Sequence, residues 1–298
     1  MMNLEVASES RRVPTLELER EHRDAGIASR KRAALPIDEH CVTLVDPESY
    51  EAGQYLRLRY CVEALRPAAR GMVVGICSPA AGDGKTLTAI NLAGALAQKK
   101  GTRVLLLDAD IRRRSEVLRS LIPLDGALAP GLVELLMRDR RNAEEAARRI
   151  EQTNIWVLPT GSFPTSPYDA FASERFVGLL DGARSQFDYV VMDAPPVVAV
   201  PDCKVLADCV DGFVMVVAAD RTPRIMLTQA LDIMGPDKLV GLVMNRCDQL
   251  PRRYYRYYGR YGYGNRKKVR SAGHVVTPQG EFVHAHHHDI DSDTNRRS

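Results

Sequence analysis

Short apolar runs separated by longer segments of helical pattern fill the middle of the chain, from about residue 47 to residue 250. The runs are continuously apolar and do not alternate with polar residues, which is typical of strands in a parallel sheet covered on both faces. The intervening segments, such as 85–100 and 221–234, are long enough for crossover helices. We therefore predict a doubly wound α/β fold whose mostly parallel sheet is flanked by helices. The predicted strands are 72–77, 103–110, 155–161, 189–196, 212–218 and 239–245.

The two ends of the chain lack this pattern. Residues 1–45 are polar, mix both charges and show no clear periodicity, so we expect a loosely ordered arm. After Asn245 the strand and helix pattern stops, and a segment rich in tyrosine, arginine and glycine follows over 251–270. Residues 271–298 contain histidines and are expected to be disordered. One folded domain over 46–250 is therefore predicted.

The composition is that of an ordinary globular protein. Of the 298 residues, 45% are apolar and 27% are charged, which suits one large α/β domain with tails. No apolar run approaches the ~20 residues that span a bilayer, and the N-terminus lacks the apolar stretch of a signal peptide. The six cysteines show neither CxxC spacing nor a disulfide framework. We therefore expect a cytoplasmic protein with reduced cysteines.

A glycine-rich loop follows the first predicted strand. The stretch SPAAGDGKTLTAINLA (78–93) nearly fits the phosphate-binding motif G-x-x-x-x-G-K-[ST], with Pro79 in place of the first glycine. Its two glycines let backbone N–H groups face a polyphosphate, and the following helix presents its positive end. Lys85 can then reach the β- and γ-phosphates of ATP, and Thr86 can hold Mg²⁺. The candidate nucleotide-binding residues of the loop are Gly82, Asp83, Gly84, Lys85, Thr86 and Leu87.

Three aspartates lie at the ends of two other predicted strands. Asp108 and Asp110 come at the end of RVLLLDAD, and Asp193 follows YVVM. A single strand-end aspartate is more often a helix N-cap or a turn residue, but three of them with the Gly-Lys-Thr loop favour a ligand site. Carboxylates at this edge can hold Mg²⁺ directly or through water. The candidate metal ligands are Thr86, Asp108 and Asp193, and the candidates for phosphoryl transfer are Lys85, Asp108, Asp110 and Asp193.

The segment RRYYRYYGRYGYGNRKK (252–268) concentrates tyrosine and positive charge. It holds six of the chain's eleven tyrosines and has no apolar face, so something outside the segment must contact them. Residues 251–270 carry eight basic side chains and no acidic one, so the remainder carries a formal charge of −5 when the total is +3. Such a run is usually a solvated tail. The sharper alternatives are an anionic partner or a charge that chemistry can reverse.

Four of these features together resemble the bacterial protein-tyrosine kinases, or BY-kinases, of capsule and exopolysaccharide synthesis. They are the loop before Lys85, the stretch DADIR that begins at Asp108, the DAPP strand end at Asp193, and the terminal tyrosine cluster. The resemblance covers roughly residues 47–263 and implies a P-loop NTPase fold and an ATP- and Mg²⁺-dependent tyrosine autokinase. It also implies that Asn245 faces the adenine, although an asparagine that closes a strand is as often a turn residue. The implied phosphoacceptors are Tyr254, Tyr255, Tyr257, Tyr258, Tyr261 and Tyr263.

The stretch EAGQYLR (51–57) resembles the family's E-x-x-R-x-x-R helix, which joins subunits into a ring. Glu51 and Arg57 match that motif and are candidate interface residues, whereas Gln54 replaces its first arginine. From the residues alone, a surface helix with polar spacing is the simpler explanation. The family also implies an activating membrane-anchored polysaccharide co-polymerase, which would recruit the chain to the inner face of the plasma membrane, and a counteracting tyrosine phosphatase.

The resemblance implies that the tyrosine cluster is phosphorylated in trans by the site of another copy. A tyrosine hydroxyl titrates near pH ~10, so a carboxylate near the metal, Asp108 or Asp110, must accept its proton. Phosphorylation of all six tyrosines would add roughly −9 to −12 charges and reverse the sign of the segment. We hypothesise that the unmodified tail is attracted to the acidic body of an adjacent subunit, and that phosphorylation repels it and loosens the ring.

Two other functions fit parts of the sequence. A partition or cell-positioning ATPase of the same fold would hydrolyse ATP with water, but such proteins typically carry an early lysine in the loop where this chain has Ala80. A nucleic-acid-binding protein could stack bases on the Arg/Tyr/Gly segment. The acidic remainder argues against a broad nucleic-acid surface, so no specific nucleic acid is expected. We expect a tyrosine autokinase that acts in exopolysaccharide synthesis or export.

Overall fold

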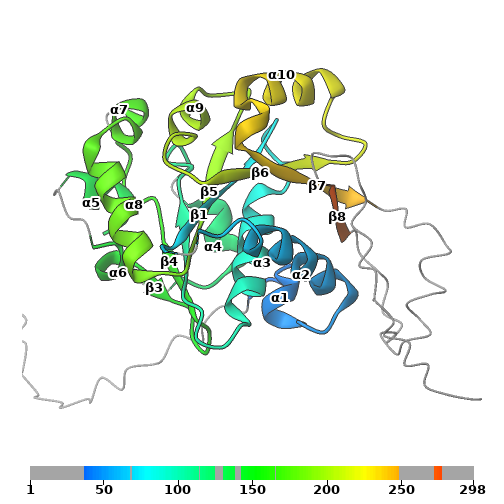
Figure 1. The fold of residues 1–298 in the computed structure, drawn as a ribbon, viewed down its shortest axis with the longest axis horizontal. Coiled ribbons are helices and arrows are strands. Elements are labelled where there is room, and N and C mark those ends of the chain that lie inside the picture. The colour runs from blue at the N-terminus through cyan, green and yellow to red at the C-terminus, as the bar shows by residue number, and fades with distance from the viewer. Residues whose placement is uncertain are drawn as a thin grey trace, which may run out of the picture. The chain divides into compact units, whose positions relative to one another are not determined.

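A computed structural model describes residues 37–67, 69–113, 115–124, 130–137, 142–164, 166–247 and 272–276. Within these residues, an eight-stranded sheet lies between two layers of helices (Figure 1). The strand order is β3-β4-β2-β5-β1-β6-β7-β8. The strands are β1 (Met72–Ser78), β2 (Val104–Asp108), β3 (Arg148–Arg149), β4 (Ile155–Leu158), β5 (Tyr189–Pro196), β6 (Gly212–Ala218), β7 (Leu239–Cys247) and β8 (Ala272–Val276).

All six strands that the apolar runs predict are present, and they pair in parallel. Strand β2 pairs with β4 and β5, β1 pairs with β5 and β6, and β6 pairs with β7. The edge strands β3 and β8 pair antiparallel with β4 and β7. The predicted doubly wound, mostly parallel sheet is therefore confirmed. The apolar pattern predicts neither edge strand: β3 has two residues, and β8 falls within the segment that we expected to be disordered.

The helices cover the sheet on both faces. One layer consists of α1 to α4, and the other of α5 to α10, followed by a short 3₁₀ turn, η1 (Figure 1). The first layer comprises α1 (Val42–Val45), α2 (Tyr50–Glu63), α3 (Lys85–Ala97) and α4 (Glu116–Leu121). The second comprises α5 (Leu132–Met137), α6 (Ala143–Ala146), α7 (Pro167–Phe171), α8 (Glu174–Gln186), α9 (Asp202–Leu206) and α10 (Arg224–Met234), and η1 spans Pro236–Lys238.

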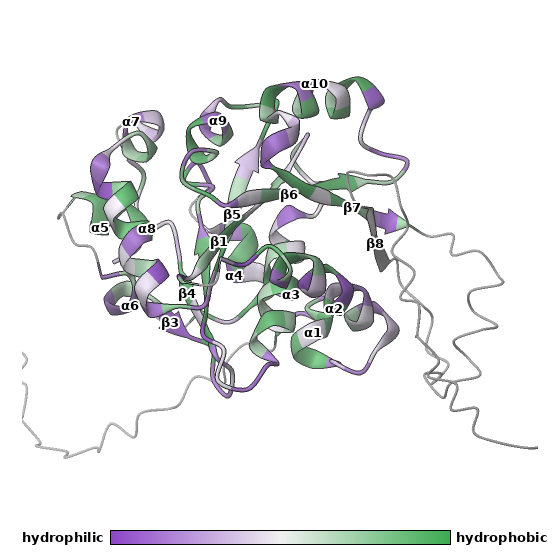
Figure 2. Cartoon of the chain, in the orientation of Figure 1, coloured by the Kyte–Doolittle hydropathy of each residue, from purple (hydrophilic) through white to green (hydrophobic). Residues whose placement is uncertain are grey.

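Successive residues of the central strands serve different helical layers. In β1, Val73 belongs to the apolar cluster that includes Phe176 of α8, whereas Val74 belongs to the cluster that includes Leu92 of α3. Every residue of β1, β2, β5 and β6 is buried. Because strand side chains alternate between faces, a strand covered on both sides must be apolar throughout. Figure 2 shows hydrophobic colouring along these strands and mixed colouring on outer helices such as α8.

The sheet brings the ends of three strands to one edge. Asp108, the last residue of β2, is in register with Asp193 of β5, and the backbone N–H of Ala109 donates to the Asp193 carbonyl over 2.9 Å. Strand β1 lies directly beside β5 and leads into the glycine-rich loop. From the adjacent strands β1 and β5 the chain runs in opposite directions, from β1 to β2 on one side and from β5 to β6 on the other, and open α/β sheets bind ligands at such a point.

Strand β7 leads into the tyrosine-rich part of the chain. Its last residue, Cys247, pairs with Ala272 of β8. Tyrosines 254, 255, 257, 258, 261 and 263 lie outside the described residues. Among the residues that the structure describes, no helix combines the length and apolar composition needed to cross a bilayer.

Candidate active site

The glycine-rich loop between β1 and α3 adopts a conformation that only glycine tolerates at two positions. Gly82 and Gly84 have φ angles of 88° and 100°, and Gly84 is the residue that caps the N-terminus of α3. A Cβ atom built on Gly84 would lie 1.9 Å from Nδ2 of Asn245. Glycine is therefore required at Gly84 both by the backbone angle and by the neighbouring side chain.

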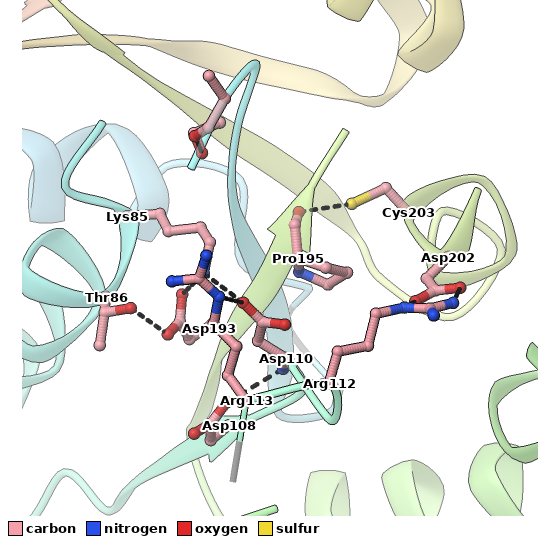
Figure 3. Close-up of polar contacts among 12 residues, drawn as sticks. Lys85, Thr86, Asp108, Asp110, Arg112, Arg113, Asp193, Pro195, Asp202 and Cys203 are labelled. Atoms are coloured by element: carbon pink, nitrogen blue, oxygen red, sulfur yellow. Dashed lines mark hydrogen bonds and ion pairs between the residues drawn. The ribbon is translucent and has the colours of Figure 1, made fainter. Parts of the chain in front are cut away.

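Lys85 and Thr86 begin α3 and point toward the acidic strand ends (Figure 3). The Lys85 Nζ lies 3.0 Å from Oδ2 of Asp110 and 3.5 Å from Oδ1 of Asp193. The Thr86 hydroxyl donates to Oδ2 of Asp193 over 2.6 Å. The structure thus brings together side chains that are 107 residues apart in the sequence, as the motifs predict.

The negative charges of Asp108 and Asp193 are unfavourable at this buried edge. Burial, and then the charge of Asp193, raise the pKa of Asp108 to about 7. Burial also raises the pKa of Asp193, against the opposing charge of Lys85. Burial by itself would lower the pKa of Lys85, but the charges of Asp193 and Asp110 outweigh it and raise that pKa. Crowded negative charge of this kind is typical of functional sites.

The same side chains fit a divalent cation bound together with phosphate. Three buried carboxylates, Asp108, Asp110 and Asp193, surround one buried ammonium. Within the described part of the chain, Oδ1 of Asp193 accepts no hydrogen bond, and no three His, Cys, Asp or Glu side chains form a complete metal cage. Mg²⁺ commonly takes one or two protein ligands and completes its shell with phosphate and water. Thr86 and Asp193 could supply such ligands.

A cleft of about 370 Å³ opens above these residues. That volume lies within the range of small-molecule sites. Besides the predicted residues it is lined by α4, through Val117, Leu118 and Leu121, and by Arg113, whose Nε lies 3.9 Å from Oδ2 of Asp110. The sequence did not predict that α4 lines the cleft, because α4 carries no phosphate-binding motif. The arginine run after Asp110 was the available signal for a cation here.

The other predicted nucleotide-binding residues differ in whether they line the cleft or contact the loop itself. Leu87 and Asn245 line the cleft. The Asp83 carboxylate is buried and accepts hydrogen bonds from the Ala80 backbone N–H over 3.0 Å and from the Thr222 hydroxyl over 2.8 Å. These contacts hold the loop itself, so the side chain of Asp83 is already engaged by protein. Sequence reasoning did not identify Thr222, which lies between β6 and α10.

Beside the cleft, an ion pair joins the loop after β2 to α9. The Arg112 guanidinium donates to both oxygens of Asp202, over 2.9 and 3.1 Å. The next residue, Cys203, donates from Sγ to the carbonyl of Pro195 at the end of β5 over 3.1 Å (Figure 3). Helix α9 therefore contacts the loop after β2 and the end of β5. All six cysteines are free in the structure.

The candidate ring helix is α2. Glu51 is partly exposed and Arg57 is exposed, whereas Gln54, which stands in place of the family's arginine, is buried and contacts the Tyr50 carbonyl over 3.5 Å. Gln54 therefore belongs to the packing of this domain. The role of Glu51 and Arg57 at an interface stays a prediction.

The sequence of this chain is similar to a known domain family and to proteins named tyrosine-protein kinases. A family model described as an AAA domain matches residues 72–220. The tyrosine-protein kinase YwqD of Bacillus subtilis is 29% identical over 78% of this chain and 97% of its own length. The tyrosine-protein kinase CpsD of Streptococcus agalactiae is 30% identical over 66% of this chain and 84% of its own.

Two further similarities are to a longer relative and to a solved structure. The succinoglycan biosynthesis transport protein ExoP of Rhizobium meliloti is 30% identical over 68% of this chain, but this match spans only 26% of ExoP. Among solved structures, the BceF tyrosine kinase domain superposes with a TM-score of 0.57 at 26% identity, covering 67% of this chain and 78% of that domain.

Proposed function

The chain belongs to the bacterial protein-tyrosine kinase family, and we propose that its cleft transfers the γ-phosphoryl group of ATP to its own tyrosine cluster in another copy. One observation carries this proposal: the Lys85 Nζ lies 3.0 Å from Oδ2 of Asp110 and 3.5 Å from Oδ1 of Asp193, at the strand ends. Phosphoryl transfer needs positioned charge more than covalent chemistry from the protein, and this group supplies it.

Each residue has a role that its position supports. The loop N–H groups and Lys85 would hold the β- and γ-phosphates, while Thr86 and Asp193 would hold Mg²⁺. Bound Mg²⁺ would neutralise charge on the transferred phosphate. The phenol oxygen of the acceptor tyrosine forms a bond to the γ-phosphorus as the bond to the β-phosphate oxygen breaks, which releases ADP.

The phenol proton must leave as this bond forms, and Asp108 suits its acceptance better than Asp110. Asp110 already contacts Lys85 over 3.0 Å and Arg113 over 3.9 Å, so two cationic side chains engage its carboxylate. The pKa of Asp108 is raised to about 7, which matches the neutral pH at which a general base is most effective. We therefore assign Asp108 as the proton acceptor and Asp110 as the partner that orients Lys85.

A mixing experiment tests transfer between copies. The donor carries Phe at all six tail tyrosines, and the acceptor carries Lys85→Met with its tyrosines intact, so their tail peptides differ in mass. After incubation with ATP and Mg²⁺, mass mapping should find phosphate on residues 254–263 of the acceptor. Phosphotyrosine that forms in the intact chain but never in the mixture would show transfer within one copy.

The same mixture separates the kinase from a partition-type ATPase. An ATPase would release inorganic phosphate at the same rate with and without acceptor tyrosines and would leave the acceptor unmodified. Lys85 contacts two buried carboxylates, so its replacement can affect the fold as well as catalysis. Thermal unfolding of the Lys85→Met chain is therefore compared with that of the parent, and matching curves show that the acceptor is folded. A donor that also carries Lys85→Arg keeps the charge and tests whether ammonium geometry matters.

We also propose a biological role and two protein partners for this activity. The name of ExoP supports a role in polysaccharide export, with a membrane-anchored co-polymerase as activator and a tyrosine phosphatase that reverses the reaction. Solubilised co-polymerase should raise the transfer rate, and no change at saturating co-polymerase would contradict this. The charge-reversal hypothesis predicts that ATP disassembles the parent oligomer in sedimentation, whereas the variant with six tyrosines replaced by phenylalanine stays assembled.

A further inference from the structure

The end of β7 makes two hydrogen bonds to the backbone of the glycine-rich loop. Nδ2 of Asn245 donates to the carbonyl of Asp83 over 2.9 Å, and Nη2 of Arg246 donates to the carbonyl of Gly82 over 3.3 Å. These are successive carbonyls of the loop and successive residues of the strand. The two segments are 162 and 164 residues apart in the sequence, so the contact depends on the strand order.

The backbone at Arg246 is in an unusual conformation for its residue type. Its φ angle is 59°, in the left-handed region that non-glycine residues rarely occupy. The backbone N–H of Arg246 donates to Oδ1 of Asn245 over 2.8 Å, which helps to hold this conformation. Strained residues of this kind persist where surrounding contacts determine them, and they cluster at functional sites. Arg246 lines the nucleotide cleft.

These contacts bear on how the loop binds phosphate. A loop that binds an anion must turn its N–H groups inward and its carbonyls outward. At glycines the peptide groups have more freedom to rotate, and Gly82 and Gly84 flank the two carbonyls in question. A donor placed on each outward carbonyl therefore favours the anion-binding orientation before any nucleotide arrives. The Thr222 hydroxyl, which donates to the Asp83 carboxylate over 2.8 Å, fixes the same residue from the end of β6.

We propose that Asn245 and Arg246 are positioning residues that preorganise the phosphate-binding loop through the Asp83 and Gly82 carbonyls. This differs from the expectation that Asn245 faces the adenine, since its amide N–H₂ is directed to the loop backbone. The inference rests on the cleft being a nucleotide site. It does not require tyrosine transfer, so binding measurements can fail or succeed independently of the kinase assay.

Competition binding with two ligands tests the proposal. The affinities of the full-length parent, Asn245→Ala and Arg246→Ala are measured for Mg-ADP and for Mg-tripolyphosphate, which lacks a base and a ribose. Loss of a positioning hydrogen bond should weaken both ligands by the same factor, about three- to tenfold. If Asn245 instead contacted adenine, its variant would weaken ADP and leave tripolyphosphate unchanged, which would overturn its assignment.

Hydrogen exchange of the ligand-free protein separates positioning from direct contact with phosphate. Faster exchange of the amides of 80–86 in both variants, with unchanged exchange in β2, is the expected result. A guanidinium that contacts only bound phosphate would leave exchange in the free protein unaltered, and that outcome would overturn the proposal for Arg246. Arg224→Ala on α10 removes the same charge from an exposed position outside the cleft lining and is the matched control. Unchanged thermal unfolding would show that each variant folds.

Discussion

The Thr86 hydroxyl donates a 2.6 Å hydrogen bond to Oδ2 of Asp193, which joins the first turn of α3 to the end of β5. Both residues are proposed ligands of Mg²⁺, so removal of this hydroxyl affects the metal site and the orientation of Asp193. We predict that Thr86→Ala raises the Mg²⁺ concentration needed for half-maximal phosphate transfer by about 10-fold or more. Thr86→Ser keeps the hydroxyl and should stay near the parent value. Equal Mg²⁺ dependence of all three proteins would contradict a metal-binding Thr86.

Asp108 makes the ligand-free protein less stable as the pH rises. Its carboxyl titrates near ~3.9 in an unfolded chain, whereas its pKa in the fold is about 7. Between these values the folded state holds the extra proton, so the free energy of unfolding falls as the pH increases from about 4 to about 7. Asp108→Asn removes this dependence and still accepts the backbone N–H of Asp110. The variant should therefore be more stable than the parent at pH 8, by more than at pH 5.

Urea unfolding of the ligand-free chain at both pH values measures this effect. Asp193, whose pKa is also raised, remains in both proteins, and because its charge interacts with that of Asp108 the comparison reports the two groups together. A stability difference between variant and parent that is identical at pH 5 and pH 8 would show that Asp108 has an ordinary pKa.

The Arg112 and Asp202 ion pair should contribute to stability through its buried partner. Asp202 is 1% exposed, whereas the Arg112 side chain is 39% exposed. Arg112→Ala leaves a buried carboxylate without its bidentate donor, and we expect a loss of about 2 kcal/mol, because partial exposure of Arg112 reduces the cost seen for fully buried pairs. Adding Asp202→Asn should recover part of the loss. Additive losses in urea unfolding would show that the two side chains do not interact.

Two glycines provide contrasting tests of the backbone. At Gly84, the φ angle of 100° and the nearby Asn245 amide predict that Gly84→Ala weakens nucleotide binding. At Gly53, inside α2, an added Cβ meets nothing within 4 Å. Gly53→Ala should therefore stabilise the protein by about 0.5–1 kcal/mol without affecting nucleotide affinity. Destabilisation by Gly53→Ala would mean that α2 packs differently or has another partner at this position.

Several elements of the fold and site could be read directly from the sequence. The runs that form β1, β2, β5 and β6 are apolar throughout because both faces of each strand are buried, and this property is visible in any short window. Lys85 and Thr86 could be identified because the turn and the helix start that they require are local. Asp108 and Asp193 followed from the rule that strand ends of a parallel sheet share one edge.

Other features depended on packing between distant segments. The raised pKa of Asp108 arises from burial beside Asp193, and the partner of Arg112 is ninety residues away on α9. Thr222, Asn245 and Arg246 reach the loop only because β6 and β7 lie beyond β1 in the sheet order. Periodicity and turn chemistry are encoded within a few residues, so the sequence alone determined the six parallel strands, the loop and the acidic edge. Contacts between side chains depend on which strands become neighbours, and only the tertiary structure decided those.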